Sequence, residues 1–250
     1  MIGGGPAGST AASMAAKSGL SVKICERSKF PREHVGESLL PASIAILEEL
    51  GLKEAISNAG FLPKYGATMV WGKDETPWSW RFSETNKRNI HSYQVSRPIF
   101  DEILLKRSAE LGVLVEEESS VGKIMIDDSN RGAVVINKNG QQYFQPAKFI
   151  VDASGQSALL ARNLNLRQWD ENFQNLAVYG YFTGAKKLPI PDENNIFIES
   201  YENGWVWTIP LNGDITSVGA VVDSNKSAAE LRKVDSRTFL EDQLSLTNRT

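Results

Sequence analysis

This chain has little that suits a secreted, membrane-spanning or nucleic-acid-binding protein. Its 250 residues include one cysteine, Cys25, which cannot form a disulfide within the chain. No apolar run approaches the ~20 residues that cross a bilayer, and the first residues lack the long apolar stretch of a secretion signal. The formal net charge is −3, and the scattered lysines and arginines form no basic stripe for a phosphate backbone. We therefore expect a cytoplasmic protein that binds neither membrane nor nucleic acid.

Metal-binding signals are also scarce. Neither of the two histidines, His34 and His91, sits in a metal-ligand spacing. Cys25 ends a run, residues 21–25, that is typical of a buried strand, so we predict that it is a small buried hydrophobe. The acidic residues 116–118 are typical of a solvated strand end. The sequence therefore predicts no metal site.

The strongest motif is the glycine turn Gly3-Gly4-Gly5-Pro6-Ala7-Gly8, which fits the pattern G-x-G-x-x-G. Gly3 permits a tight turn, Gly5 lets a pyrophosphate approach the backbone, and Gly8 lets the following helix pack closely on its strand. The helix predicted over 6–17 offers free N–H groups at its N-terminus. Glu26 ends the next strand, where a carboxylate accepts hydrogen bonds from an adenosine ribose. We predict a dinucleotide site with Gly3, Gly5, Pro6, Ala7, Gly8 and Glu26 as cofactor-binding residues.

Helix and strand signals alternate along the rest of the chain. Residues 2–60 read as β-α-β followed by a helix near 41–50. Residues 65–92 change to short strands rich in Trp and Phe, which suits an antiparallel sheet. Helical spacing returns at 99–111, and a small meander follows. From about residue 166 strands dominate, at 177–183, 195–199, 205–210 and 216–222.

These signals predict an α/β protein with two interleaved domains. Residues 1–62 and 96–165 are expected to form a Rossmann-type dinucleotide-binding domain. Residues 63–95 and 166–250 are expected to form an antiparallel β-sheet substrate domain. Only Met1 and Ile2 precede the glycine turn, so most of a first strand is missing.

The order of three motifs resembles that of the flavoprotein monooxygenases and their relatives. The glycine turn is followed by Val95-Ser96-Arg97-Pro98-Ile99-Phe100-Asp101 and then by Asp152-Ala153-Ser154-Gly155. The resemblance implies that the dinucleotide is FAD. It further implies that Arg97 contacts the flavin, that Val121 lies near the adenine, and that Asp152 and Gly155 contact the pyrophosphate or ribityl chain.

Three further segments resemble the flavin-dependent halogenases. The segment at 29–41, KFPREHVGESLLP, is similar to the loop that passes over the flavin and contains Glu37. The segment at 61–67, FLPKYGA, places Lys64 where that family has its active-site lysine. The segment at 204–210, GWVWTIP, fits the family signature W-x-W-x-I-P. The resemblance implies that Glu37 binds the cofactor, that Lys64 is catalytic, and that Trp205 and Trp207 separate flavin from substrate.

The resemblance also implies a reaction. Reduced FAD is supplied as FADH2 by a separate flavin reductase and reacts with oxygen to give a flavin hydroperoxide. A halide ion then reacts with this hydroperoxide to form hypohalous acid. Lys64 then directs this acid to an electron-rich aromatic, a phenol, pyrrole or indole that is free or tethered to a carrier protein. Burial lowers the pKa of a lysine from ~10.4 and makes its amine nucleophilic. The neighbours of Lys64 in the sequence are apolar or aromatic, which favours partial burial.

Two alternative interpretations use the same residues. One is an FAD-dependent monooxygenase or a flavoprotein of the geranylgeranyl reductase type, in which Lys64 has no catalytic role. The other is a non-catalytic gene fragment. The family has a further G-D turn and a helical C-terminal region that we do not find before Thr250. We therefore expect a chain that is truncated at both ends, with the C-terminal part of the substrate domain missing.

Overall fold

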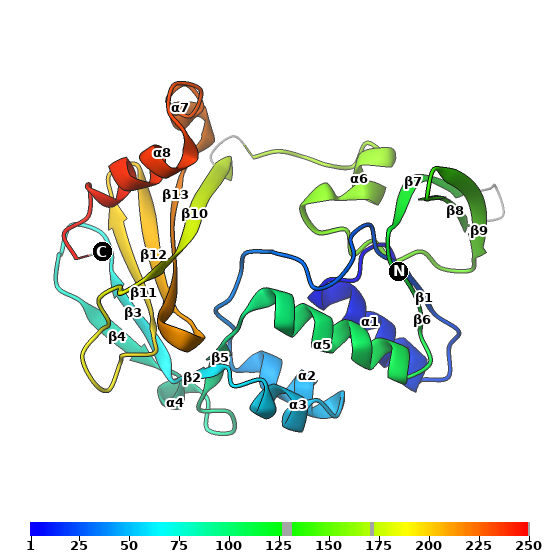
Figure 1. The fold of residues 1–250 in the computed structure, drawn as a ribbon, viewed down its shortest axis with the longest axis horizontal. Coiled ribbons are helices and arrows are strands. Elements are labelled where there is room, and N and C mark those ends of the chain that lie inside the picture. The colour runs from blue at the N-terminus through cyan, green and yellow to red at the C-terminus, as the bar shows by residue number, and fades with distance from the viewer. Residues whose placement is uncertain (127–131, 171–172, 250) are drawn as a thin grey trace. The chain divides into compact units, whose positions relative to one another are not determined.

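The computed structural model describes residues 1–126, 132–170 and 173–249, which form two compact units (Figure 1). The first unit consists of Met1–Val35, Glu48–Ile56 and Arg97–Gln168, and the second of Gly36–Leu47, Ser57–Ser96 and Trp169–Thr250. The predicted domain boundaries differ from these units mainly at 36–47, which lies in the second unit. The reason is backbone pairing, because Leu39 N donates to Tyr93 O and Val95 N donates to Glu37 O.

A short parallel sheet lies at the centre of the first unit. Strand β1 (Lys23–Cys25) pairs with β6 (Leu114–Glu116), and Ile2 forms parallel bridges to both Cys25 and Asp152. Two helices, α1 (Pro6–Lys17) and α5 (Arg97–Glu110), pack against each other. The bounds predicted for the first helix, residues 6–17, are confirmed. The small side chains of Ser13 and Ser108 let the two helices approach, with their hydroxyl oxygens 3.0 Å apart.

An antiparallel meander also belongs to the first unit. It consists of β7 (Ser119–Ile126), β8 (Gly132–Lys138) and β9 (Gln141–Ala147). Its apolar residues Val134 and Ile136 form one core cluster with Ile2 and Cys25. Cys25 is 5% exposed, so the prediction of a buried cysteine is confirmed. The short helices η1 (Gly155–Ser157) and α6 (Leu159–Asn163) follow the meander.

The second unit is built on one six-stranded sheet. Its strand order is β10-β13-β12-β11-β3-β4. The strands are β3 (Gly66–Val70), β4 (Trp78–Arg81), β10 (Asn175–Thr183), β11 (Ile196–Tyr201), β12 (Gly204–Pro210) and β13 (Ile215–Asp223). The prediction that residues 65–92 join the later strands in one sheet is confirmed for β3 and β4, whereas Ser92 belongs to a separate two-stranded sheet. One pair departs from it, because β3 and β11 are parallel while the other pairs are antiparallel.

A two-stranded sheet and several short helices make up the other elements. Strand β2 (Leu62–Lys64) pairs with β5 (Ser92–Gln94), and the pairing continues on the other side through a bridge between Ser38 and Gln94. The remaining helices are α2 (Ala42–Glu49), α3 (Lys53–Asn58), α4 (Phe82–Thr85), α7 (Ser224–Ser227) and α8 (Ser236–Leu244). None of the described helices has the length and apolar character needed to cross a membrane.

Helix α8 was not predicted from the sequence. It packs against β10 and β13 (Figure 1), where Leu240 joins a cluster with Val206, Val218 and Ala220. Its N-terminus is capped by Asp235, whose carboxylate accepts hydrogen bonds from the N–H groups of the next turn. This aspartate was the available signal in a segment that is otherwise short and polar.

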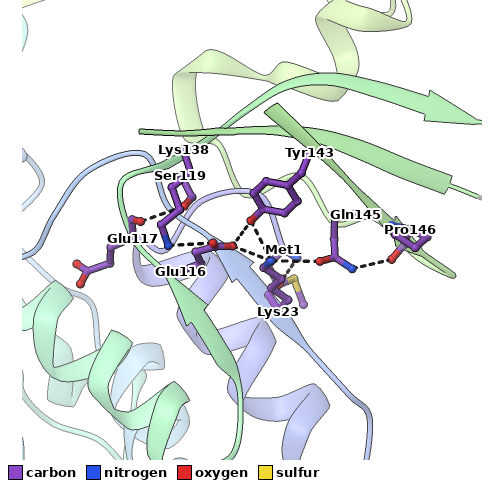
Figure 2. A network of polar contacts seen from close by, with 9 residues as sticks. All are labelled: Met1, Lys23, Glu116, Glu117, Ser119, Lys138, Tyr143, Gln145 and Pro146. Carbon is purple, nitrogen blue, oxygen red and sulfur yellow. Dashed lines mark hydrogen bonds and ion pairs between the residues drawn. The ribbon is translucent and has the colours of Figure 1, made fainter. Parts of the chain in front are cut away.

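A polar network joins the parallel sheet to the meander (Figure 2). The carboxylate of Glu116 on β6 accepts from Lys23, Lys138 and Tyr143, and its side chain is only 17% exposed. The expectation of a solvated end at 116–118 is therefore wrong for Glu116, although Glu118 is exposed. Partial burial alone would raise the pKa of Glu116, but the hydrogen bonds outweigh it and lower the pKa to about 2.

A Glu116→Gln variant tests this network. The ordinary glutamate pKa is near 4.5 and that of Glu116 is about 2, so its stabilising contribution is complete above pH 4.5 and is lost as the pH falls toward 2. We expect the variant to unfold at lower urea concentration than the parent chain at neutral pH, and the two to converge in strong acid. Glu110→Gln is the control, because that carboxylate is 63% exposed. Equal urea midpoints for Glu116→Gln and the parent at neutral pH would contradict the stabilising role.

Candidate functional site

Close backbone contacts dictate the glycine turn in the first unit. Gly3 has φ +97°, and a Cβ there would lie 2.5 Å from Ala153 O. A Cβ on Gly8 would lie 2.0 Å from Gly3 O, so the helix can begin this close to the strand only if residue 8 is glycine. At Gly5 the nearest atom to an added Cβ belongs to the guanidinium of Arg32, at 3.2 Å, and not to the backbone. The predicted tasks of the three glycines fit this geometry, because the backbone is crowded at Gly3 and Gly8 and accessible at Gly5.

The N-terminus of α1 begins at this turn. Gly5 is the N-cap residue and provides no side-chain cap, and Pro6 occupies the first helical position. The N–H groups of Ala7 and Gly8 therefore have no acceptor within the helix. Such N–H groups, together with the helix dipole, favour an anion such as a pyrophosphate.

Glu26 lies directly beside the glycine turn. It is 4% exposed, and its carboxylate accepts from Gly4 N at 2.7 Å and from Ser28 N at 2.8 Å. These bonds hold the turn against the end of β1. The contact to Gly4 was not foreseen, and the predicted bond to a ribose stays a prediction.

The turn at residues 152–155 lies next to the glycine turn. Ala153 N donates to Ile2 O at 2.9 Å, which places Asp152 at the end of a neighbouring parallel strand. The Asp152 carboxylate accepts from Ser154 N at 3.0 Å and from Leu160 N at 2.8 Å. Although burial alone would raise the pKa of Asp152, these bonds lower it. Gly155 follows with φ +62° and open space around it. The two predicted turns thus meet at the carboxyl edge of one parallel sheet, where α/β folds bind ligands.

Two other predicted cofactor residues lie elsewhere in the first unit. Val121 is a half-buried residue of β7, packed on the core cluster of the meander, next to a bulge. Arg97 begins α5 and is buried, with its guanidinium forming two hydrogen bonds to Asp101 at 2.8 and 2.9 Å. Sequence analysis gave no role to Asp101, although it lies one helical turn after Arg97. The flavin contact of Arg97 and the adenine contact of Val121 stay predictions.

Lys64, in the second unit, is buried, and among the residues that the structure describes no acidic side chain pairs with it. Its side chain ends β2, and the residue is 1% exposed. The amine Nζ donates to Ser38 Oγ at 2.5 Å and lies 5.3 Å from the centroid of the Phe82 ring. Burial lowers the pKa of Lys64 to about 8, with no contribution from a charged group. The burial is deeper than the partial burial expected, and the contacts with Ser38 and Phe82 were not foreseen.

The two tryptophans lie on one face of β12, as their alternation predicts. The ring centroids of Trp205 and Trp207 are 5.9 Å apart. Trp207 is 5% exposed and donates from Nε1 to Ser217 Oγ at 3.2 Å. Tyr179 on β10 continues the group, with its ring centroid 6.4 Å from that of Trp207. The ring centroid of Tyr181 lies 6.1 Å from that of Tyr179. We call these two tyrosines and the two tryptophans the aromatic face.

Glu37 is attached to the aromatic face. It is 1% exposed, and its Oε1 accepts from the Tyr181 hydroxyl at 3.1 Å. Its Oε2 accepts from Gly36 N at 2.9 Å. The predicted contact of Glu37 with the cofactor stays a prediction.

A cavity of about 900 Å³ in the second unit lies away from these residues. Its walls include Phe182, Thr208 and Val218, on the sheet face that carries α8. Neither Lys64 nor the tryptophans line it. The cavity is therefore separate from Lys64 and from the aromatic face. In the part of the chain that the structure describes, no cluster of three or more His, Cys, Asp and Glu side chains could hold a metal ion.

Gly219 makes room for Trp207. It lies opposite Trp207 on β13, and a Cβ there would come within 2.3 Å of the indole. We expect Gly219→Ala to displace the indole and to lower the free energy of unfolding by about 1–3 kcal/mol, as overpacking does. Tryptophan fluorescence and urea unfolding measure both effects. The control is Gly180→Ala on the neighbouring strand, where the added Cβ would be 3.2 Å from Phe182. An unchanged spectrum for Gly219→Ala would contradict this packing role.

Known proteins match this chain over most of its length. The tryptophan halogenase family model matches residues 1–91 and 83–243. Tryptophan 2-halogenase of Chondromyces crocatus is 37% identical over 225 residues, which are 89% of this chain and 42% of that protein. The 1H-pyrrole-2-carbonyl-[peptidyl-carrier protein] chlorinase of Pseudomonas fluorescens is 36% identical over 246 residues, 88% of this chain and 54% of that protein.

A solved structure agrees with the sequence relatives. The myxobacterial chondrochloren halogenase CndH, described as a variant of FAD-dependent halogenases, superposes with a TM-score of 0.91 and 39% identity. The match covers 98% of this chain and 56% of that chain. The chain thus spans about half the length of the relatives that it matches. On the extent of the family match and the fold that it shares, the chain belongs to the tryptophan halogenase family.

Proposed function

We propose that the protein is a flavin-dependent halogenase, an oxidoreductase that uses reduced FAD, oxygen and a halide ion to halogenate an electron-rich aromatic compound. The observation that carries the proposal is Lys64, whose amine is buried and pairs with no charged group among the described residues, in a chain of this family. Family membership gives no comparable support to the monooxygenase or reductase interpretations.

The residues of the first unit fit the cofactor. Gly5 leaves its backbone accessible, the N-terminus of α1 offers N–H groups, and Glu26 places a buried carboxylate beside the turn. These features suit the pyrophosphate and ribose of FAD. Asp152 and Gly155 lie at the same edge of the sheet, and Arg97, Val121 and Glu37 are assigned to the cofactor from the family resemblance alone. Reduced FAD supplies the two electrons with which oxygen and halide give hypohalous acid.

Lys64 is proposed to direct the hypohalous acid. With its pKa near 8, about a tenth of the amine is uncharged at pH 7, far more than for an ordinary lysine. An uncharged amine can donate a hydrogen bond to the oxygen of the acid. Alternatively, its lone pair attacks the halogen to form a nitrogen–halogen bond while the oxygen leaves as water with the amine proton. In both routes burial at 1% exposure excludes the bulk water that would dilute the oxidant.

The aromatic face is proposed to keep flavin and substrate apart. Indole and phenol rings are stiff and large. Trp207 donates a hydrogen bond to Ser217, and its indole fits into the space that a side chain at Gly219 would fill. A wall of this kind prevents direct oxygen transfer to the substrate and leaves only a small oxidant to pass.

The relatives support the proposed substrate class. Their names specify a halogenase of tryptophan and a chlorinase of a carrier-bound pyrrole. We extend the proposal to a phenol, pyrrole or indole, free or carrier-bound, with FADH2 supplied by a separate flavin reductase. The cytoplasmic location expected from the sequence stays a prediction.

Substitution of Gly5 tests the cofactor. Gly5→Val should abolish FAD binding, because the branched side chain would occupy the volume that the pyrophosphate needs. Gly5→Ala is the graded control, since its methyl group meets only the guanidinium of Arg32 at 3.2 Å. Binding is measured by flavin fluorescence titration, with circular dichroism to confirm folding. Stoichiometric FAD in folded Gly5→Val would remove the cofactor assignment.

Substitution of Lys64 tests the reaction, in the longest natural form of the protein. Lys64→Ala should keep FAD affinity and lose the halogenated product, with peroxide or free hypohalite released instead. Lys64→Arg should also fail, because a guanidinium stays protonated. Mass spectrometry of phenols, pyrroles and indoles incubated with reduced FAD, oxygen and bromide gives the yields.

Lys53→Ala is the matched control for Lys64→Ala, because the Lys53 side chain is 82% exposed. In the parent, yield at saturating reduced flavin should rise as the pH increases through about 8, where the Lys64 amine loses its charge. Halogenation by Lys64→Ala at the parental rate would end the catalytic assignment. Hydroxylation without bromide incorporation by the parent would favour the monooxygenase interpretation.

A further inference from the structure

The environment of the Lys64 amine consists of neutral polar groups. Lys64 lies opposite Ser92 in the pairing of β2 with β5, and Ser38 lies opposite Gln94 on the other side of β5. Side chains of Lys64, Ser92, Gln94 and Ser38 therefore share one face of this small sheet. All four belong to the same compact unit.

These neighbours are acceptors without charge. Ser38 Oγ accepts from the amine, while Ser92 Oγ and Gln94 Oε1 are buried and have no hydrogen-bond partner among the described residues. Ser92 is 0% and Gln94 1% exposed. An ammonium group has three N–H donors, so neutral acceptors on this face can satisfy it when it is charged. They stabilise the charge less than a carboxylate would, which lets the amine lose its proton.

Ser38 has a fixed position beside the amine. The backbone on either side of it is bonded to β5, through Leu39 N to Tyr93 O at 3.0 Å and Val95 N to Glu37 O at 2.8 Å. The backbone therefore holds the hydroxyl group in place, and its removal leaves the strand pairing intact.

We propose that Ser38 is a positioning residue for Lys64, whose hydroxyl aims the amine and, with Ser92 and Gln94 on the same face, supports its charged form without a counter-ion. The neutral acceptor keeps the lysine in one orientation while leaving its proton exchangeable. The catalytic part of this inference rests on the proposed function, whereas the contact itself does not.

The test is a pH titration of Lys64 in the 250-residue chain, labelled with 13C-lysine and followed by NMR at the ε carbon. The Lys64 signal is identified by its loss in Lys64→Met. The parent should titrate near pH 8. In Ser38→Ala the loss of an acceptor from the charged form should lower the pKa by about one unit. Ser38→Thr keeps the hydroxyl and should titrate as the parent does, and Ser38→Asp should raise the pKa by pairing the charge.

Ser43→Ala is the control, because the Ser43 hydroxyl lies in the same segment but donates to Leu40 O at 2.7 Å. It should leave the titration unchanged. An unaltered Lys64 pKa in folded Ser38→Ala, or no increase in Ser38→Asp, would overturn the proposal. If Ser38→Ala does not fold, the contrast between Ser38→Thr and Ser38→Asp decides the matter.

The catalytic arm is measured separately, in the longest natural form of the protein. At pH 9 and above, where the amine is mostly uncharged in both proteins, Ser38→Ala should reduce the halogenated product at least tenfold with FAD affinity unchanged, and Ser38→Thr should restore it. If the parent forms no halogenated product, the proposed function fails while the NMR result still decides the positioning role. If the titration shifts as expected but Ser38→Ala halogenates at the parental rate, the positioning role in catalysis is wrong.

Discussion

Burial of the Lys64 amine, with no acidic side chain among the described residues bonded to it, is the constraint on which the proposed chemistry depends. Removal of a charge from water is unfavourable, and the usual compensation is a carboxylate that fixes the charge in place. Lys64 has instead a hydroxyl acceptor and an aromatic ring, Ser38 and Phe82. Both favour the charged form only modestly, so the free energies of the two protonation states stay close near neutral pH. A lysine in this condition can act as nucleophile or donor, whereas a paired lysine is a fixed cation.

The glycine turn of the first unit depends on a different constraint, the distance between backbone atoms. Gly8 approaches Gly3 O so closely that any side chain would collide, and a Cβ on Gly3 would lie 2.5 Å from Ala153 O. These contacts bring the turn, the start of α1 and the 152–155 turn to one edge of the parallel sheet. The close approach of backbone atoms therefore shapes the site, and the carboxylates of Glu26 and Asp152 hold its turns by hydrogen bonds. This is why a pattern of three glycines is enough to predict it.

Local patterns accounted for what the sequence could predict. The bounds of α1 followed from the glycine turn and the alanine-rich run, and the common face of Trp205 and Trp207 followed from alternation along a strand. The rest depends on partners distant in the chain. Glu26 bonds to Gly4, and Lys64 bonds to Ser38, because the chain folds back on itself in three dimensions. No periodicity in a single segment contains that information.

The same limit explains the elements that differed. The parallel pairing of β3 with β11 joins segments more than a hundred residues apart, and strand direction leaves no mark in either segment. The position of 36–47 in the second unit has the same origin, since its short bridge to β5 is too brief to produce a strand pattern. Propensity and spacing identify elements, and tertiary pairing decides which elements meet.

That short bridged segment connects the two functional groups of the second unit. Adjacent side chains of an extended chain point to opposite faces, so the side chains of Glu37 and Ser38 point in opposite directions. Glu37 accepts from Tyr181 of the aromatic face, and Ser38 accepts from Lys64. Both are anchored by the backbone bonds to β5 that flank them. A displacement of this segment would therefore move two groups together, the carboxylate that bonds to the aromatic face and the hydroxyl that accepts from Lys64.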